Sequence, residues 1–243
     1  MNGRLLPLLK TSGPKQMALD ELLLESSLKS SSNSPTLRFY QWEGNWLSIG
    51  RHQLQWPKSW AKLANSEAFN IVRRPSGGGG VLHIGGLTYS LVWPGAPKKR
   101  KEAYYQTTSW LIKSFAELGF PLRFGTESLS PINRDCFQTS TIADLIDPNG
   151  QKRVGSAQFW RKGYLLQHGE ILLDPPTKLW REIFNSCAPE PAPSTIPRKG
   201  LQEFLLMGLN TSWPEINWQK SDLTKYEKEK LSFNSSKYIV PLN

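Results

Sequence analysis

The sequence predicts an α+β fold in which a mixed, largely antiparallel β-sheet is flanked by helices. Many short runs are apolar or alternate between apolar and polar residues, and turn-forming residues bound them, as in strands joined by turns. Helical patterns also occur, but they do not follow nearly every strand, as the crossovers of a parallel sheet would require. A chain of 243 residues is long enough to bury one substantial core.

The clearest helix is predicted over residues 16–29, where several leucines supply a buried face and acidic residues face solvent. A second long helix is expected over residues 102–118, because Gly119 is a typical helix stop. Shorter helical segments are expected over 57–65, over 179–184, and twice within 199–230, on either side of Trp213-Pro214.

Strands are predicted for the remaining runs, at residues 1–10, 36–42, 46–50, 69–72, 87–93, 121–124, 142–147, 152–158 and 165–173. The second and third of these are expected to pair as a hairpin across Glu43-Gly44-Asn45. His168-Gly169 is expected to interrupt the last strand, and residues 236–240 to add an edge strand or pack as a cap. We expect one domain over residues 1–187, with a proline-rich connector and short helical tail, residues 188–243, packed on it.

Composition limits the classes of function. No stretch approaches the ~18 consecutive apolar residues of a membrane-spanning helix. The two cysteines, Cys136 and Cys187, do not make a disulfide framework, so a cytoplasmic location is expected. The formal charge of +10 is spread along the chain, apart from the run at 98–101, and no nucleic-acid-binding module is present. An acidic protein partner and a solvated basic face without a partner are both consistent with this charge.

The chain is organised around the stretch from Arg73 to His83, which contains four consecutive glycines at 77–80. Without Cβ atoms, its backbone N–H groups can approach a flat or anionic ligand, and Arg73 and Arg74 add charge suited to carboxylate or phosphate. A flexible surface turn is the alternative. The stretch is not a Walker A loop, because no Gly-Lys-Ser/Thr follows, and Leu82 replaces the last glycine of a dinucleotide fingerprint.

A second stretch, residues 150–158, predicts a turn followed by a strand that begins at Lys152. On a strand, Lys152 and Val154 share one face, and an inward lysine needs a partner or a chemical role. The alternative is an exposed lysine just after a turn. Gly155 allows a ligand or another backbone to approach closely.

Five blocks occur in order within residues 16–174: QMALDELLL, FYQWEGNWLSIGRHQ, RRPSGGGGVLHIGGLTYS, GQKRVGSAQ and LLQHGEILL. Together they resemble the catalytic domain of the lipoate–protein ligase, octanoyltransferase and biotin–protein ligase superfamily. The resemblance implies a class II synthetase/biotin–lipoate ligase-like fold with its catalytic domain in residues 1–187. It also implies transfer of a lipoyl or octanoyl group to a lysine of a small acidic carrier domain.

Partners and cofactors follow from the same resemblance. The implied carrier is a lipoyl domain of the 2-oxoacid dehydrogenase E2 or glycine cleavage H-protein type, with acyl carrier protein as a further candidate. The lipoyl or octanoyl group is a substrate, no cofactor is expected to be tightly bound, and only a ligase would need ATP and Mg. We expect a monomer that binds neither nucleic acid nor membrane.

The resemblance also assigns residues. Lys152 matches the lysine that binds the acyl carbonyl or carboxylate, and acyl transfer needs such a cation because negative charge builds on the carbonyl oxygen. Substrate-binding positions match Arg74, Ser76, Gly77, Gly78, Gly79, His83, Tyr89, Gly155, Ser156, Ala157, His168 and Gly169. No metal site is expected, since neither His83 nor His168 has a cysteine or carboxylate partner at ligand spacing.

Cys136 decides between reactions. It lies sixteen residues before Lys152, where the cysteine-dependent octanoyltransferases carry their nucleophile in an Ala-Cys-Phe motif. A thiol beside a lysine ammonium ionises more readily, so Cys136 is a candidate catalytic residue that takes an acyl group from a carrier thioester without ATP. A buried, inert cysteine is the alternative.

Other functions stay open. An ATP-dependent lipoate–protein ligase would form lipoyl-AMP in the glycine loop without using Cys136. A non-catalytic carrier-binding homologue is suggested only by departures from the family pattern, at Ile84 and Arg153. Gln16 is a third departure, because the resembled family usually has asparagine at this position, and it affects only the details of ligand contact. Biotin ligation and nucleic-acid binding rank below these.

Overall fold

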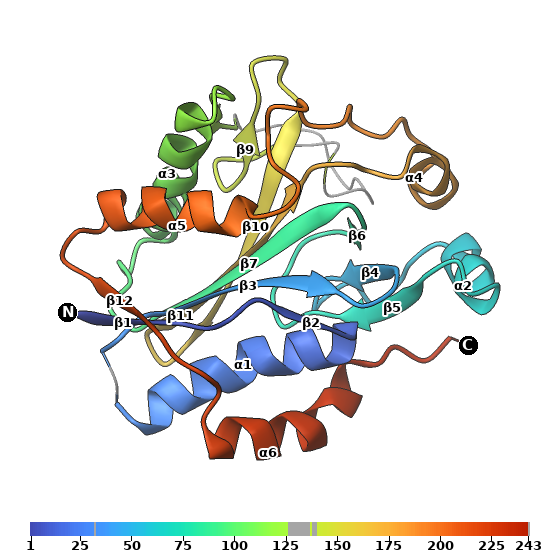
Figure 1. Ribbon diagram of the computed structural model, residues 1–243. Coiled ribbons are helices and arrows are strands. Elements are labelled where there is room, and N and C mark those ends of the chain that lie inside the picture. Colours follow the sequence, from blue (N-terminus) through green and yellow to red (C-terminus); the bar gives the residue numbers. More distant parts are fainter. Residues whose placement is uncertain (32, 126–136, 138–139, 243) are drawn as a thin grey trace.

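The computed structural model describes residues 1–31, 33–125, 137 and 140–242. Within this part of the chain, nine strands form one large sheet in the order β12-β1-β3-β7-β11-β10-β9-β8, with β2 paired to β3 (Figure 1). These strands are β1 (Asn2–Leu5), β2 (Leu9–Thr11), β3 (Thr36–Trp42), β7 (Gly86–Trp93), β8 (Arg123–Phe124), β9 (Leu145–Ile146), β10 (Lys152–Arg161), β11 (Tyr164–Leu172) and β12 (Asn217–Lys220).

Pairing in the large sheet is antiparallel from β3 through β7, β11, β10 and β9 to β8. It is parallel only on the other side, where β1 pairs with β12 and β3, and β2 pairs with β3. The prediction of a mixed, largely antiparallel sheet flanked by helices is therefore confirmed.

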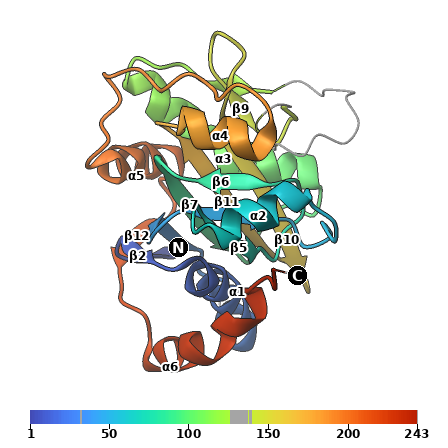
Figure 2. The same ribbon diagram turned by 90° about the vertical axis from the view of Figure 1, so that its right-hand side faces the viewer.

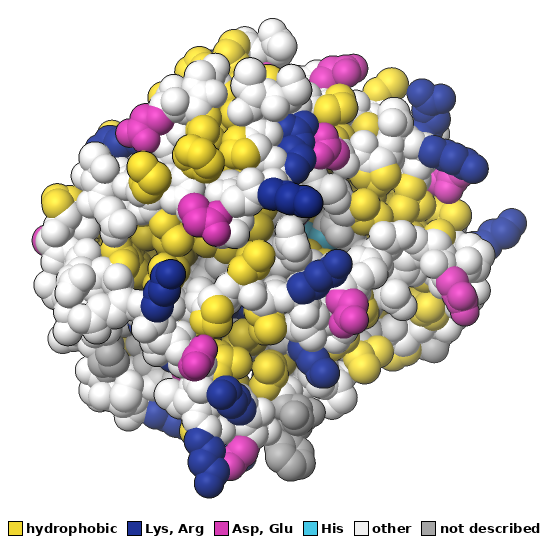
Figure 3. Space-filling view, viewed as in Figure 1, with side chains coloured by type: hydrophobic (Ala, Val, Ile, Leu, Met, Phe, Trp, Pro, Cys, Tyr) yellow, Lys and Arg dark blue, Asp and Glu magenta, His cyan; other side chains and the backbone are white. Residues whose placement is uncertain are grey.

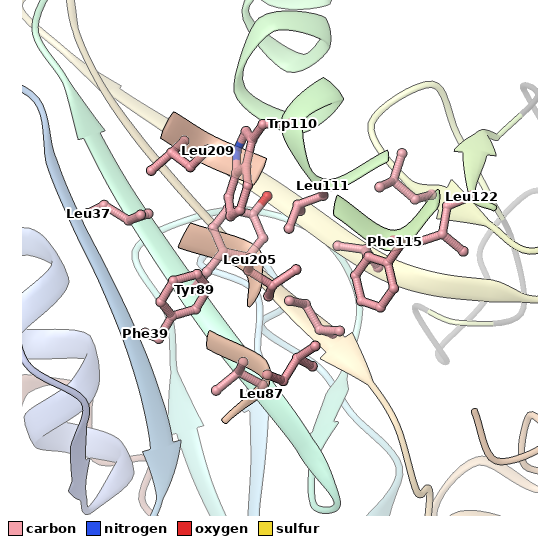
Figure 4. Close-up of a cluster of buried hydrophobic side chains, with 14 of the residues drawn as sticks. Leu37, Phe39, Leu87, Tyr89, Trp110, Leu111, Phe115, Leu122, Leu205 and Leu209 are labelled. Atoms are coloured by element: carbon pink, nitrogen blue, oxygen red, sulfur yellow. The ribbon is translucent and has the colours of Figure 1, made fainter. Parts of the chain in front are cut away.

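The described helices are α1 (Gly13–Lys29), α2 (Lys58–Asn65), α3 (Arg100–Glu117), α4 (Thr177–Phe184), α5 (Leu201–Ser212) and α6 (Lys225–Asn234). Helices α3 and α5 cover one face of the large sheet, and α1 covers the other, with α6 packed against it (Figure 1). The alternation of side chains along β7 explains this arrangement. Leu87, Tyr89 and Leu91 join the cluster beneath α3 and α5 (Figure 4), whereas Val92 packs on the α1 side.

A separate small sheet is formed by β5 (Asn70–Arg73), β4 (Trp46–Ile49) and β6 (Val81–His83), in that order. Figure 2 shows its strands close to α2 and α4. The predicted hairpin between residues 36–42 and 46–50 is wrong, because β4 pairs with β5 and β6 instead of β3. Leu47 and Ile49 of β4 pack with Trp60 of α2 in an apolar cluster of their own, which draws the strand away from β3.

Other elements differ more locally from the prediction. His168-Gly169 does not interrupt β11, since both residues pair with β7 on one side and β10 on the other. The predicted helix after Trp213-Pro214 is preceded by the strand β12, whose only described strand partner is β1. The segment at 236–240 forms a 3-10 turn (Ser235–Tyr238) and a single bridge from Ile239 to Val72 rather than an edge strand.

Elements of the C-terminal segment pack against the rest of the fold, in addition to the bridge from Ile239 to Val72. Helix α5 packs on α3, β12 extends the large sheet, and α6 packs on α1. The predicted boundary between residues 187 and 188 stays a prediction. Among the described helices, none is both long and apolar enough to cross a membrane.

Candidate active site

The middle of the large sheet supplies the floor of the site. Two cross-strand rows lie there, one formed by Arg38, Ser90, His168 and Ala157, the other by Tyr40, Thr88, Glu170 and Gly155. Both rows belong to the face that α1 covers, since His168 and Arg38 bond to Asp20 of α1. Strand β11 thus has to run unbroken for His168 and Glu170 to point to the same side.

Two adjoining cavities bring the predicted residues together. The smaller, of about 70 Å³, is lined by the predicted residues Arg74, Gly77, Gly78, His83, Gly155, Ser156, Ala157, His168 and Gly169. The larger, of about 560 Å³, is lined by Lys152 together with Ser76, Gly77, Gly78, Gly79, Ser156 and Ala157. Tyr89 lies behind them and bonds to the Ser156 hydroxyl at 2.8 Å. Cys136 lies outside the described residues, and Cys187 is exposed and lines neither cavity.

Lys152 is buried, with 4% of its surface exposed, so the alternative of a surface lysine is wrong. Its Nζ lies 3.0 Å from Oδ1 of Asp144, which is buried as well. This buried ion pair lies at the edge of the larger cavity. Phe137, the residue after Cys136 in the sequence, places its ring centroid 5.3 Å from the same Nζ. A Cβ on Gly155 would come within 3.0 Å of the lysine chain, which explains the glycine there.

The glycine loop, residues 74–80, is stabilised by hydrogen bonds from the side chain of its own Arg74 to backbone carbonyl oxygens. The Arg74 guanidinium donates to the carbonyl oxygens of Ser48, Gly77 and Gly79, at 3.0, 2.7 and 2.7 Å respectively. Arg73 likewise donates to carbonyls of the 50–53 turn. Both guanidinium groups therefore bind backbone in this structure, and the predicted ligand contact of Arg74 stays a prediction.

A polar cluster closes the smaller cavity around His83. Its Nδ1 lies 2.7 Å from Glu170 and its Nε2 lies 2.8 Å from the Ser48 hydroxyl, while its ring stacks on Trp42. Burial lowers the pKa of His83 below its usual value, although Glu170 acts in the opposite direction. A neutral His83 that donates from Nδ1 to Glu170 accepts from Ser48 through Nε2.

A second buried cluster ties α1 to the glycine loop. Nδ1 of His168 lies 2.8 Å from Oδ2 of Asp20, and its Nε2 lies 2.5 Å from Oγ of Ser76. Arg38 binds Oδ1 of Asp20 through two nitrogens, at 3.0 and 2.6 Å. Burial alone would raise the pKa of the Asp20 carboxyl, but Arg38 and His168 outweigh it and lower the pKa to about 2. Asp20 is therefore ionised at neutral pH.

The departures from the family pattern have structural partners. Gln16 accepts from Arg38 at 2.6 Å and donates to the carbonyl of Gln41, so it orients the Asp20 cluster. Arg153 pairs with Asp147 at 2.8 Å and lines neither cavity. Ile84 packs at the edge of the apolar cluster around α2.

Four charged residues that matter here were not predicted: Asp20, Arg38, Asp144 and Glu170. The prediction that the acidic residues of the first helix, Asp20 among them, face solvent is wrong for Asp20, which is fully buried. Its place among the buried apolar residues of 17–24 was the sequence signal for this. Arg38 gives a similar signal inside the alternating strand of residues 36–42. Asp144 and Glu170 offer none, because the sequence alone does not show that their side chains are buried and paired.

The comparisons with known proteins add to this geometry. A model of the lipoyl protein ligase A/B catalytic domain matches residues 12–204. This chain belongs to that family. Octanoyltransferase LipM of Lysinibacillus sphaericus is 34% identical over 193 residues, which are 74% of this chain and 69% of the relative. Octanoyltransferase LipM of Symbiobacterium thermophilum is 32% identical over 88% of this chain and 82% of its own.

Solved structures share the fold. A lipoate protein ligase of T. acidophilum has a TM-score of 0.79 at 23% identity, covering 98% of this chain and 95% of its own. The structure of a lipoate-protein ligase A bound with ATP has a TM-score of 0.75 at 22% identity, and the match covers 98% of this chain and 95% of that chain. The predicted family, fold and class of enzyme, an acyltransferase or ligase of protein lipoylation, are thus confirmed. The alignment with the LipM relative of Geobacillus kaustophilus spans 64% of that protein's length.

Proposed function

We propose that this enzyme transfers an octanoyl or lipoyl group from a carrier thioester to a lysine of a lipoyl carrier domain, through a thioester on Cys136. In the first step the Cys136 thiolate attacks the acyl carbonyl carbon, the bond to the donor sulfur breaks, and the donor thiolate takes up a proton. In the second step the lysine amine of the carrier attacks the new thioester, loses a proton, and releases the Cys136 thiol.

Lys152 is the group that polarises the carbonyl in both steps. Negative charge develops on the carbonyl oxygen, and a fixed ammonium in a water-poor cavity stabilises it strongly. Asp144 holds Lys152 in place at 3.0 Å, and Asp144 is itself held by the N–H and hydroxyl of Thr141 at 2.8 and 3.0 Å. The backbone of the glycine loop lines the same cavity and would contact the acyl group.

The observation that carries the proposal is the contact of Phe137 with Lys152. The ring centroid of Phe137 lies 5.3 Å from the lysine Nζ, and the residue before it in the sequence is Cys136, whose assignment as nucleophile comes from its matched position in the sequence. Phe137 is buried and packs edge-on against Trp180 of α4, which fixes that point of the chain. The relatives named as octanoyltransferases support the same reaction.

The acyl donor and acceptor are part of the proposal. Arg51 and Arg100 are exposed at the larger cavity, which suits acidic carriers. We include among them a lipoyl domain as acceptor and acyl carrier protein as donor. One T. acidophilum structure with this fold contains a ligase described with its E2 lipoyl domain. A monomeric, cytoplasmic enzyme without a tightly bound cofactor completes the proposal.

Intact-mass analysis tests the reaction. Wild-type protein incubated with an octanoyl carrier thioester should gain one octanoyl group that neutral hydroxylamine removes, as it removes thioesters. Cys136→Ser should lose this adduct, and Cys187→Ser, the matched control, should keep it.

The same variants separate the alternative. In an ATP-dependent ligase working through lipoyl-AMP, lipoate-dependent exchange of pyrophosphate into ATP would persist in Cys136→Ser, and no hydroxylamine-labile adduct would form in the wild type. That result would replace the thioester mechanism by ligation. A protein that modifies no lipoyl domain under either condition would be a carrier-binding homologue.

A further inference from the structure

Three residues far apart in sequence form a hydrogen-bonded chain beside the proposed acyl site. Oγ of Ser76 lies 2.5 Å from Nε2 of His168, and Nδ1 of His168 lies 2.8 Å from Oδ2 of Asp20. Ser76 comes from the glycine loop, His168 from β11 and Asp20 from α1. Their side chains are almost fully buried, so the geometry is fixed by the fold.

The hydrogen-bond directions follow from the partners. The Asp20 carboxylate can only accept, so Nδ1 of His168 carries a hydrogen, and the form of the ring that acts as a base accepts the Ser76 hydroxyl hydrogen at Nε2. Arg38 and Tyr40 also bond to Asp20, which prevents the carboxylate from turning away from the imidazole. This is the order of groups found in serine nucleophiles: hydroxyl, imidazole base and orienting carboxylate.

The hydroxyl is also close to groups that can stabilise an oxyanion. Ser76 lines the same cavity as Lys152 and as the backbone of Gly77 and Gly78. Ser156 in that cavity provides a contrast, because its hydroxyl bonds to Tyr89 and not to a histidine. Among the serines of the cavity, Ser76 is therefore the one with a base in hydrogen-bonding contact.

We propose that Ser76 is a second nucleophile of this site, activated by His168 and oriented through Asp20, and that it gives the enzyme a thioesterase activity independent of Cys136. The Ser76 oxygen attacks the carbonyl carbon of an acyl thioester, and its proton passes to Nε2 of His168. The carbon–sulfur bond then breaks, and the imidazolium protonates the departing thiolate. Water attacks the resulting oxygen ester with His168 as base, the ester bond breaks, and the proton returns to Ser76 as the fatty acid leaves.

An alkyl fluorophosphonate, which phosphonylates activated serines, tests the nucleophile directly. We expect peptide mapping to place the label on Ser76. His168→Gln, which retains a hydrogen-bonding side chain, should lower the labelling rate at least 100-fold, by the usual contribution of a general base. Ser66→Ala, a control at an exposed serine that lines neither cavity, should keep the label on Ser76. No label on Ser76, or a rate unchanged in His168→Gln, would overturn the proposal.

Hydrolysis of an octanoyl thioester in the Cys136→Ser background tests the activity. Slow release of octanoate is expected there, and it should disappear in Cys136→Ser/Ser76→Ala. An acyl adduct that resists neutral hydroxylamine identifies the oxygen ester. Equal hydrolysis with and without Ser76 would refute the activity. The labelling and hydrolysis assays depend neither on a Cys136 thiol nor on a carrier lysine. A negative result in them therefore refutes only the role of Ser76, and a negative result in the transfer assay refutes only the proposed acyl transfer.

Discussion

Lys152 and Asp144 show how a single charged pair can serve both stability and chemistry. The pair is nearly fully buried, and each member satisfies the other's charge. Removing one member of such a pair leaves an uncompensated buried charge, whose cost is about 3–5 kcal/mol. Removing both costs much less, because no lone charge remains.

A variant pair separates the two roles. Lys152→Gln should lower acyl transfer about 100- to 1,000-fold, as removal of one oxyanion-stabilising group does, and should lower the free energy of unfolding. Lys152→Gln/Asp144→Asn should regain most of the stability and none of the activity. Denaturant unfolding and transfer rates measure the two effects. Recovery of activity in the double variant would show that Lys152 acts only through packing.

The glycine loop illustrates what one element needs from its neighbours. Gly50 follows β4, and a Cβ there would lie 2.1 Å from the carbonyl oxygen of Gly78. Backbone cannot yield at that distance, so the loop would have to move. Gly78 itself has φ +96, a conformation that L side chains rarely adopt.

Gly50→Ala should therefore displace the loop from the acyl site. We expect transfer to fall by more than about 10-fold, with about 1–3 kcal/mol lost from the free energy of unfolding. Gly95→Ala is the matched control, because its added Cβ would meet its nearest neighbour at 3.6 Å. Activity unchanged in Gly50→Ala would mean that the loop's position does not limit the reaction.

The sequence predicted much of the large sheet and many of the residues that line the two cavities, for different reasons. Alternation and turn residues predicted β3, β7 and β10, while the order of glycines, Lys152 and His168 along the chain allowed the family to be recognised. The partners of β4 could not be predicted, because they depend on the packing of Leu47 and Ile49 against Trp60 of α2, which the pattern of the strand does not reveal. The pairing of Asp144 with Lys152 became visible only in three dimensions, because the sequence does not show that both side chains are buried.

Buried ionisable groups on the α1 face of the sheet determine how stability responds to acid. The pKa of Asp20 is lowered to about 2, against 3.8 for a free carboxyl, mainly by Arg38 and His168 against the effect of burial. A lowered carboxyl pKa contributes stability that is complete above about pH 5 and is lost as the pH falls through 3.8 towards 2. The pKa of His83 is also lowered, by burial, so a further loss begins as the pH falls through 6.5.

The expected outcome is a free energy of unfolding that declines below about pH 7 and again below about pH 5. Asp20→Asn should be less stable at neutral pH, because Arg38 loses its charge partner, and should show a smaller second decline. The rest of that decline comes from other carboxyl groups with lowered pKa values: Glu21, Asp174 and Glu227. His83→Gln should lack part of the first decline, the one below about pH 7. Urea titrations between pH 8 and pH 3 measure both; identical pH profiles for Asp20→Asn and wild type would contradict this account.

The position of β12 has a consequence for how the chain matures. Strand β1 is formed by the first residues, yet one of its two neighbours, β12, is formed by residues 217–220. During synthesis, the edge of β1 that pairs with β12 therefore presents a row of unpaired backbone groups until residues 217–220 have left the ribosome. Such an open edge can pair with other chains, so a nascent or prematurely terminated form is more exposed to aggregation than the finished enzyme.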